Sequence, residues 1–165
     1  MQAERRGSLW KGLLAGALGG FVGSFAMSQF HSLVVPRVQT SSERDKDDST
    51  VLAGSAISQA FFHHELTERE RKVVGPAVHY AFGASMGAVY AMLVERAPGA
   101  RAGWGVPFAI VLWMGAHVIT VPALGLSEPI TRSSLAAEGA EFGAHVVYGA
   151  ATETVRRVAR LYLMP

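Results

Sequence analysis

The chain has 165 residues, of which 50% are hydrophobic and 17% charged, with a formal net charge of +2. A soluble domain usually has about a quarter of its residues charged, so this composition favours a membrane protein. The sequence has no cysteine or asparagine and no long or aromatic-interleaved basic run, which excludes disulfides, thiolate metal sites, N-glycosylation and the usual nucleic-acid-binding surfaces.

The first apolar segment, residues 12–35, contains no charged side chain. It is longer than the apolar region of a cleaved signal peptide, so we expect a retained membrane span over about 10–35. Trp10 lies where an interfacial aromatic is expected. Small residues recur at every fourth position and share one helix face, along which a second membrane helix can approach closely. The members of this face are Gly12, Gly16, Gly20, Ser24 and Ser28.

Residues 36–72 form the expected first extramembrane loop. Within it, residues 51–62 place apolar side chains at helical spacing, but this stretch is too short to span a bilayer. It therefore predicts a short interfacial or re-entrant helix. Thr67 and Glu70 fit a capping box, so the next long helix is expected to begin near Thr67 and to enter the membrane near residue 73.

The second and third spans are expected at about 73–94 and 103–125. The second repeats the small-residue face with Gly83 and Gly87. Pro98 and the glycine after it are a turn signal, which predicts a tight hairpin between the two spans. Pro122 is expected to kink or end the third span near its far side.

The fourth span is expected at about 136–156, after two serines that can cap a helix. Glu141 is deep enough in this segment to need a partner, and His145, one turn later, is the natural one. Glu153 and Arg157 repeat the same spacing and predict an interfacial salt bridge.

Together these segments predict an all-α fold class. We expect residues 1–165 to be a single integral membrane domain, a four-transmembrane-helix bundle with a short interfacial helix in the first extramembrane loop. An even number of spans places both termini on one side. The arginines near the end of the chain favour the cytoplasm for that side.

The sequence from His79 onward combines several features in a specific order. The most specific part is Glu141 and His145, followed by Glu153 and two arginines. The other features are Phe82 to Tyr90, Pro98, Gly105, His117, Pro122, Gly125, Leu126, Gly143, Ala144 and Tyr148. This pattern resembles the YagU-like family of uncharacterised bacterial inner-membrane proteins. The resemblance implies a multi-pass protein of the bacterial plasma membrane and implies no catalytic residues.

Each expected span carries one histidine, and the helix rise of about 1.5 Å per residue places all four at a similar depth. Such a polar layer can relay protons or ions, or hold haem or a metal; alternatively, each histidine makes a single hydrogen bond to a neighbouring helix. A protein without a cofactor is our leading expectation. The candidate layer consists of His31, His79, His117, Glu138, Glu141, His145 and Tyr148.

Three functions remain open. The small-residue faces exceed what one minimal bundle needs, which favours an accessory or assembling subunit, as a homo-oligomer or in a larger membrane complex. A proton or ion relay is the first alternative, and a haem- or metal-binding redox module is the second. The G-x-S-x-G string at residues 83–87 lies inside a membrane helix rather than at a strand–turn–helix junction, so we do not expect an enzyme.

Overall fold

A computed structural model of the chain describes residues 2–38, 48–127 and 130–163, and the regular elements in these ranges are all helices. The all-α fold class is therefore confirmed for this part of the chain. The elements are α1 (Gln2–Val38), α3 (Ser49–Phe62), α4 (Glu68–Arg96), η1 (Pro98–Arg101), α5 (Val106–Leu112), η2 (Trp113–Thr120), α6 (Val121–Ala123), η3 (Ile130–Arg132), α7 (Leu135–Val158) and η4 (Ala159–Leu163).

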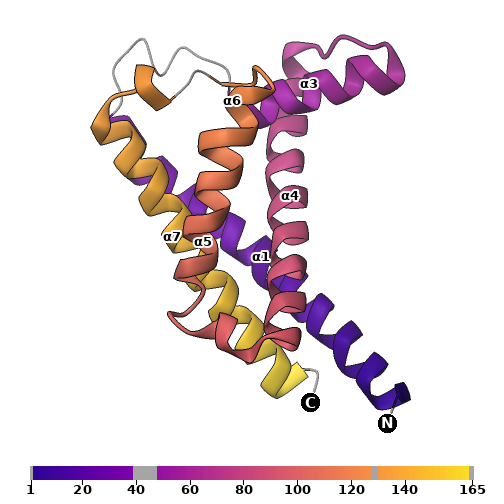
Figure 1. The fold of residues 1–165 in the computed structure, drawn as a ribbon. Coiled ribbons are helices and arrows are strands. Elements are labelled where there is room, and N and C mark those ends of the chain that lie inside the picture. Colours follow the sequence, from indigo (N-terminus) through magenta and orange to yellow (C-terminus); the bar gives the residue numbers. More distant parts are fainter. Residues whose placement is uncertain (1, 39–47, 128–129, 164–165) are drawn as a thin grey trace.

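Three long helices form the centre of the bundle. Helix α1 crosses behind α4 and α7 and packs against both, while α5 packs against α7 and α3 packs against α4 (Figure 1). The start of α1 and the end of η4 lie at one end of the molecule, which we call the termini end. Helices α3 and α6 lie at the opposite end, which we call the loop end.

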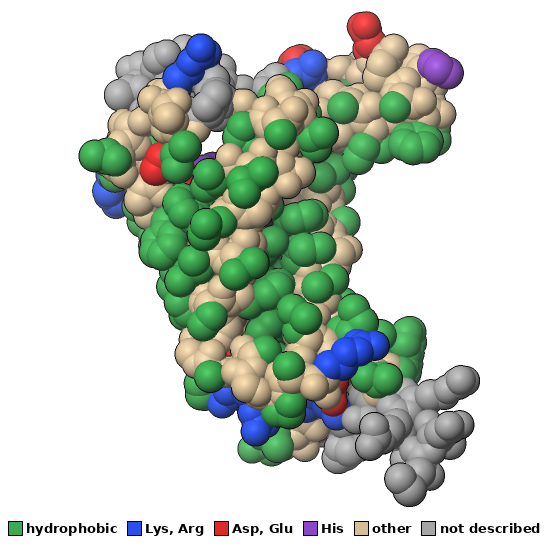
Figure 2. Space-filling view, in the orientation of Figure 1, with side chains coloured by type: hydrophobic (Ala, Val, Ile, Leu, Met, Phe, Trp, Pro, Cys, Tyr) green, Lys and Arg blue, Asp and Glu red, His purple; other side chains and the backbone are tan. Residues whose placement is uncertain are grey.

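Three helices are long and apolar enough to cross a membrane: Leu9–Val38, Glu68–Arg96 and Val106–Ala123. Figure 2 shows hydrophobic side chains over the middle of the visible face, with Lys, Arg, Asp and Glu side chains gathered toward the two ends. This distribution is that of a membrane protein, because charged side chains are costly in the hydrocarbon core. Helix α7 is not among the three, and it carries three glutamates and two arginines.

The helix boundaries follow local sequence signals. The Thr67 side chain accepts a hydrogen bond from the Glu70 N–H, and the Glu70 carboxylate accepts one from the Thr67 N–H at 2.8 Å, so the predicted capping box is confirmed. The Asp48 side chain caps α3 by accepting a hydrogen bond from the Thr50 N–H, and the Ser134 side chain caps α7 by accepting one from the Ala137 N–H. Helix α6 ends one residue after Pro122, as predicted.

The small-residue faces of α1 and α4 lie against each other. A Cβ atom added at Gly20 would meet the Gly83 carbonyl oxygen, and one added at Gly87 would meet the Gly16 carbonyl oxygen. The Ser24 side chain fills the space beside Gly83, and Glu95 lies beside Gly12. The two backbones therefore approach as closely as glycine allows.

A second tight contact joins α1 to α7. A Cβ atom at Gly19 would meet the Thr152 carbonyl oxygen, and one at Gly23 would meet the Thr152 hydroxyl. Helix α1 is thus held between α4 and α7 by small residues on two of its faces.

The predicted hairpin of the second and third spans is wrong in one respect. The chain does turn at η1, but α5 packs chiefly against α7 and contacts α4 only locally, with the Tyr90 and Phe108 ring centroids 4.9 Å apart. The reason is a close backbone approach between Gly105 and Gly149, where either Cβ atom would meet the other residue's carbonyl oxygen. Gly105 also has a φ of 79°, which favours glycine.

Candidate functional site

Histidine and glutamate side chains gather where the first turns of α7 meet the last turns of α1 and the middle of η2. The residues come from three separate elements, α1, η2 and α7. We call this group the His/Glu cluster. Its members are His31, His117, Glu138, Glu141 and His145.

The first pair in the cluster joins α1 to α7. The His31 Nε2 atom lies 3.1 Å from the Glu141 Oε2 atom, with side chains 32% and 18% exposed. The contact is an ion-pair contact without well-aligned hydrogen-bond geometry. The sequence correctly indicated that Glu141 needs a partner, but His145 as the partner of its carboxylate is wrong. The His145 Nδ1 atom instead donates to the Glu141 carbonyl oxygen at 2.8 Å.

The second pair joins η2 to α7. The His117 Nε2 atom lies 3.1 Å from the Glu138 Oε2 atom, again with both side chains largely covered. The Trp113 ring stacks beside the His117 ring at 6.3 Å between centroids. The His145 ring lies 6.0 Å from the His117 ring between centroids, and its Nδ1 atom bonds the Glu141 backbone, so His145 lies next to both pairs.

A π-helix positions His117. In η2 the Thr120 hydroxyl donates to the Gly115 carbonyl oxygen, and the Val121 N–H donates to the Ala116 carbonyl oxygen, five residues back. Such segments are rare and occur frequently at functional sites. The widened turn changes the direction of the residues that follow, and no residue pattern in the sequence indicated it.

Two residues of the predicted layer lie outside the cluster. The His79 Nε2 atom donates to the Ser24 carbonyl oxygen at 3.3 Å, and the Tyr148 hydroxyl donates to the Gly83 carbonyl oxygen at 2.7 Å. Both bonds join separate helices, so these two side chains have a packing role. The Ser28 hydroxyl bonds the Ser24 carbonyl oxygen within α1 itself.

The arrangement of the cluster is that of paired acids and bases. Within the described residues, no group of three or more His, Asp or Glu side chains is placed to hold a metal ion. Each carboxylate instead faces one imidazole, and His145 lies next to both pairs. Groups in this arrangement can exchange protons near neutral pH, because imidazole is the side chain that titrates there.

A second charged group lies at the termini end. Glu153 is completely buried, and Arg156 binds it with Nε–Oε2 and Nη2–Oε1 distances of 2.6 and 3.0 Å. The Arg157 Nε atom also donates to Glu153, and its guanidinium lies 3.9 Å from the centroid of the Trp104 ring. The predicted Glu153–Arg157 contact is present, and it is part of a three-residue network with Arg156 in which Glu153 and Arg156 are buried.

Comparison with known proteins gives one match. Residues 43–154 match the sequence model of a family described as "Protein of unknown function (DUF1440)". The matched region contains every member of the His/Glu cluster except His31, which lies on α1. No curated protein and no solved structure matches the chain.

Proposed function

We propose that this chain, which belongs to the family described as "Protein of unknown function (DUF1440)", takes up and releases protons at its His/Glu cluster as a small multi-pass plasma-membrane protein. The observation that supports this function is the geometry of the two His–Glu pairs, each at 3.1 Å, with the His145 ring 6.0 Å from the His117 ring. The function is a proton relay that opens toward the loop end of the bundle.

Electrostatics link the cluster to pH. An isolated charge near the centre of a membrane helix costs about 2.5–3.5 kcal/mol on insertion scales, so each glutamate favours a protonated imidazole beside it. The facing charged groups are His31, His117 and His145 on one side and Glu138 and Glu141 on the other, with Asp48 also acting on His31. With two of the three imidazoles protonated, the cluster is neutral. Its net charge therefore depends on how many of its imidazoles hold a proton.

In this proposal, protons reach the side chains of the cluster from the loop end and not from the termini end. Those of His31 and His117 are 32% and 27% exposed. Farther along α7 toward the termini end, Tyr148 and Thr152 are buried and carry no charge. A half-channel that opens toward the loop end fits this gradient better than a continuous pore.

The test is a histidine titration. The full chain, labelled with ¹⁵N-histidine and held in detergent micelles, is followed by NMR from pH 5 to 8. We expect the histidine resonances of the cluster to change across this range, because the cluster takes up and releases protons. Glu141→Gln and Glu138→Gln should each reduce this proton uptake, because each removes a carboxylate that stabilises a protonated imidazole.

The matched control is Glu65→Gln, at an exposed glutamate in the loop between α3 and α4, which should leave the proton uptake of the cluster unchanged. Imidazoles that keep one protonation state throughout the range would reject the proposal. Proton uptake that is the same in the wild type and in both cluster variants would also reject it.

Self-assembly as a subunit is a second candidate, favoured by apolar side chains that stay uncovered. On η2 and α3, Met114, Ile119 and Phe61 are 51%, 61% and 77% exposed. Because the glycine faces are occupied within the chain, a homo-oligomer would have to use these surfaces. This candidate is rejected if the mass of the protein in detergent, measured by light scattering, corresponds to one chain.

A further inference from the structure

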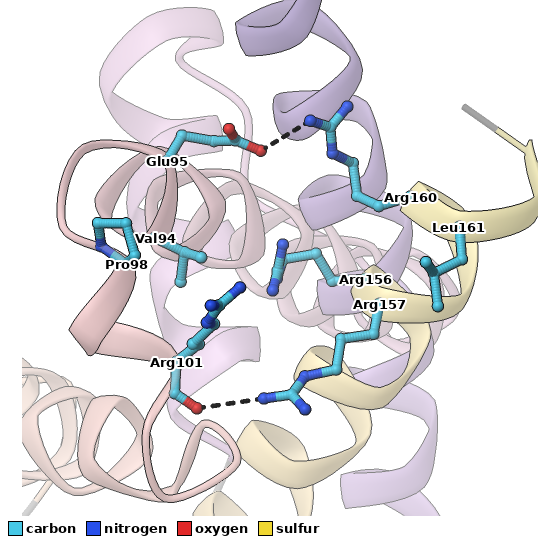
Figure 3. Close-up of a pocket in the computed structure, with 8 residues that line it drawn as sticks. All are labelled: Val94, Glu95, Pro98, Arg101, Arg156, Arg157, Arg160 and Leu161. Carbon is cyan, nitrogen blue, oxygen red and sulfur yellow. Dashed lines mark hydrogen bonds and ion pairs between the residues drawn. The ribbon is translucent and has the colours of Figure 1, made fainter. Parts of the chain in front are cut away.

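A pocket lies at the termini end, far from the His/Glu cluster along α7. Its volume is about 400 Å³, and it lies between the ends of α4 and α7, η1 and η4 (Figure 3). Half of its lining residues are arginines. The lining residues are Val94, Glu95, Pro98, Arg101, Arg156, Arg157, Arg160 and Leu161.

The pocket carries an excess of positive charge. The Arg160 Nη2 atom lies 3.2 Å from the Glu95 Oε1 atom, and Glu153 behind the wall pairs with both Arg156 and Arg157. Among the described residues that line or back the pocket, four guanidinium groups therefore stand against the two carboxylates of Glu95 and Glu153. Like charges held together at a partly covered site are unfavourable, and a bound anion would offset that cost.

Two guanidiniums point toward each other across the pocket. Figure 3 shows the Arg101 side chain, from η1, directed toward the Arg156 side chain, from α7. Glu153 uses the Nε and Nη2 atoms of Arg156, which leaves Nη1 available to another acceptor. Planar guanidinium forks match the oxygen spacing of a phosphate group.

The surroundings place the pocket at the level of a membrane surface. Trp104, which stacks under Arg157, is 49% exposed, as expected for an interfacial aromatic. Leu161, at the rim, is 70% exposed and offers an apolar side chain next to the arginines. Basic pockets between helix ends at this level suit anionic headgroups.

We propose that this pocket binds a phosphate group, supplied either by the headgroup of an anionic phospholipid or by a soluble phosphate. Arg101 and Arg156 hold the phosphate oxygens, and Arg160 and Arg157 raise the local positive potential. The site is independent of the His/Glu cluster.

Two measurements on the purified full chain distinguish the sources. In the first, native mass spectrometry counts lipids retained from micelles with equal phosphatidylglycerol and phosphatidylcholine. In the second, isothermal titration follows inorganic phosphate. Phosphatidylglycerol retained over phosphatidylcholine assigns the site to lipid, and saturable binding of phosphate assigns it to a soluble anion.

Arg101→Gln is the informative variant, because the Glu153 network does not use its guanidinium. We expect it to weaken binding about tenfold, the effect of losing one charge-assisted hydrogen bond. Arg101→Lys, which keeps the charge but not the fork, should fall in between. Arg96→Gln removes the same charge at the same end outside the pocket and should leave binding unchanged.

The melting temperature of each variant is measured alongside, and Arg101→Lys carries the test if Arg101→Gln does not fold. The proposal is overturned if neither anion binds, or if Arg96→Gln weakens binding as much as Arg101→Gln.

Discussion

Glu153 shows how strongly a single residue depends on its partners in this bundle. Its side chain is completely buried, and it stays charged because Arg156 and Arg157 donate to both carboxylate oxygens. A buried pair of this kind adds little net stability, but removing one partner leaves an uncompensated charge.

We therefore expect Arg156→Ala to destabilise the protein by about 3–5 kcal/mol. Arg96→Ala, at an exposed position of α4, should change stability by less than about 0.5 kcal/mol. Thermal or denaturant unfolding of both variants in the same detergent compares them. Equal effects of the two substitutions would show that the buried network is not what stabilises this end of the bundle.

At this scale, the sequence indicates which residues need partners but not where the partners are. Glu141 was identified by its depth in an apolar segment, whereas its partner His31 lies on another helix. Helical spacing reveals only neighbours on the same helix, which is why His145 was preferred. The burial of Glu153 was not predicted, because it comes from the close approach of α1 and α5 to α7, which is a tertiary feature.

At the scale of elements, the glycines of α1 determine how closely three helices pack. Gly16 and Gly20 contact α4, and Gly19 and Gly23 contact α7. The predicted small-residue face of α1 thus meets that of α4 within one chain. The excess of small residues, which favoured an assembling subunit, is largely explained by packing inside the monomer.

Gly20→Leu should therefore loosen the contact between α1 and α4, because its Cβ atom would meet the Gly83 carbonyl oxygen. We expect a loss of several kcal/mol, the usual size of an overpacking effect combined with a displaced helix. The melting temperature in detergent measures it.

Gly139→Leu is the matched control, because no atom lies within 4 Å of a Cβ at that position of α7. It should be neutral or stabilise slightly, as leucine favours a helix more than glycine does. If the Gly20→Leu protein has the same melting temperature as the wild type, the packing role of Gly20 is wrong.

Other features of the elements could not be predicted from the sequence. Gly149 contacts Gly105 as an isolated glycine, outside any repeated pattern, and so carried no signal. The π-helix of η2 arises from hydrogen bonds five residues apart, which no residue type specifies. By contrast, the caps at Thr67 and Ser134 could be predicted from the sequence, because each depends on residues only three positions apart.

At the scale of the whole molecule, hydrophobic length was sufficient to predict the helical class and the three apolar spans. The fourth span remains a proposal, because α7 mixes apolar and charged residues. Each of its charged groups has a partner within the bundle: Glu138 and Glu141 face histidines, and Glu153 faces two arginines. Such pairing lowers the cost of crossing the membrane. Figure 1 shows α7 running from the loop end to the termini end beside α1.

Single-cysteine labelling tests this topology, and the natural absence of cysteine makes the chain well suited to it. Ser42, in the first loop, lies outside the described residues, so we choose Glu65 and Arg132 for the loop end and Gly99 and Tyr162 for the termini end. All four positions are exposed, and Tyr162 is 77% exposed. With four spans and cytoplasmic termini, an impermeant maleimide should label Glu65→Cys and Arg132→Cys in intact cells. Gly99→Cys and Tyr162→Cys should react only after the membrane is permeabilised.

The comparison of Gly99→Cys with Tyr162→Cys isolates the fourth span. Gly99 follows α4, whereas Tyr162 follows α7, so the two share a side only if the chain crosses the membrane once through α5, η2 and α6 and once more through α7. Labelling of Tyr162→Cys in intact cells, with Gly99→Cys still protected, would mean that α7 does not cross. A complete reversal of all four positions would keep the four spans but place the termini, and with them the arginine pocket, outside the cell.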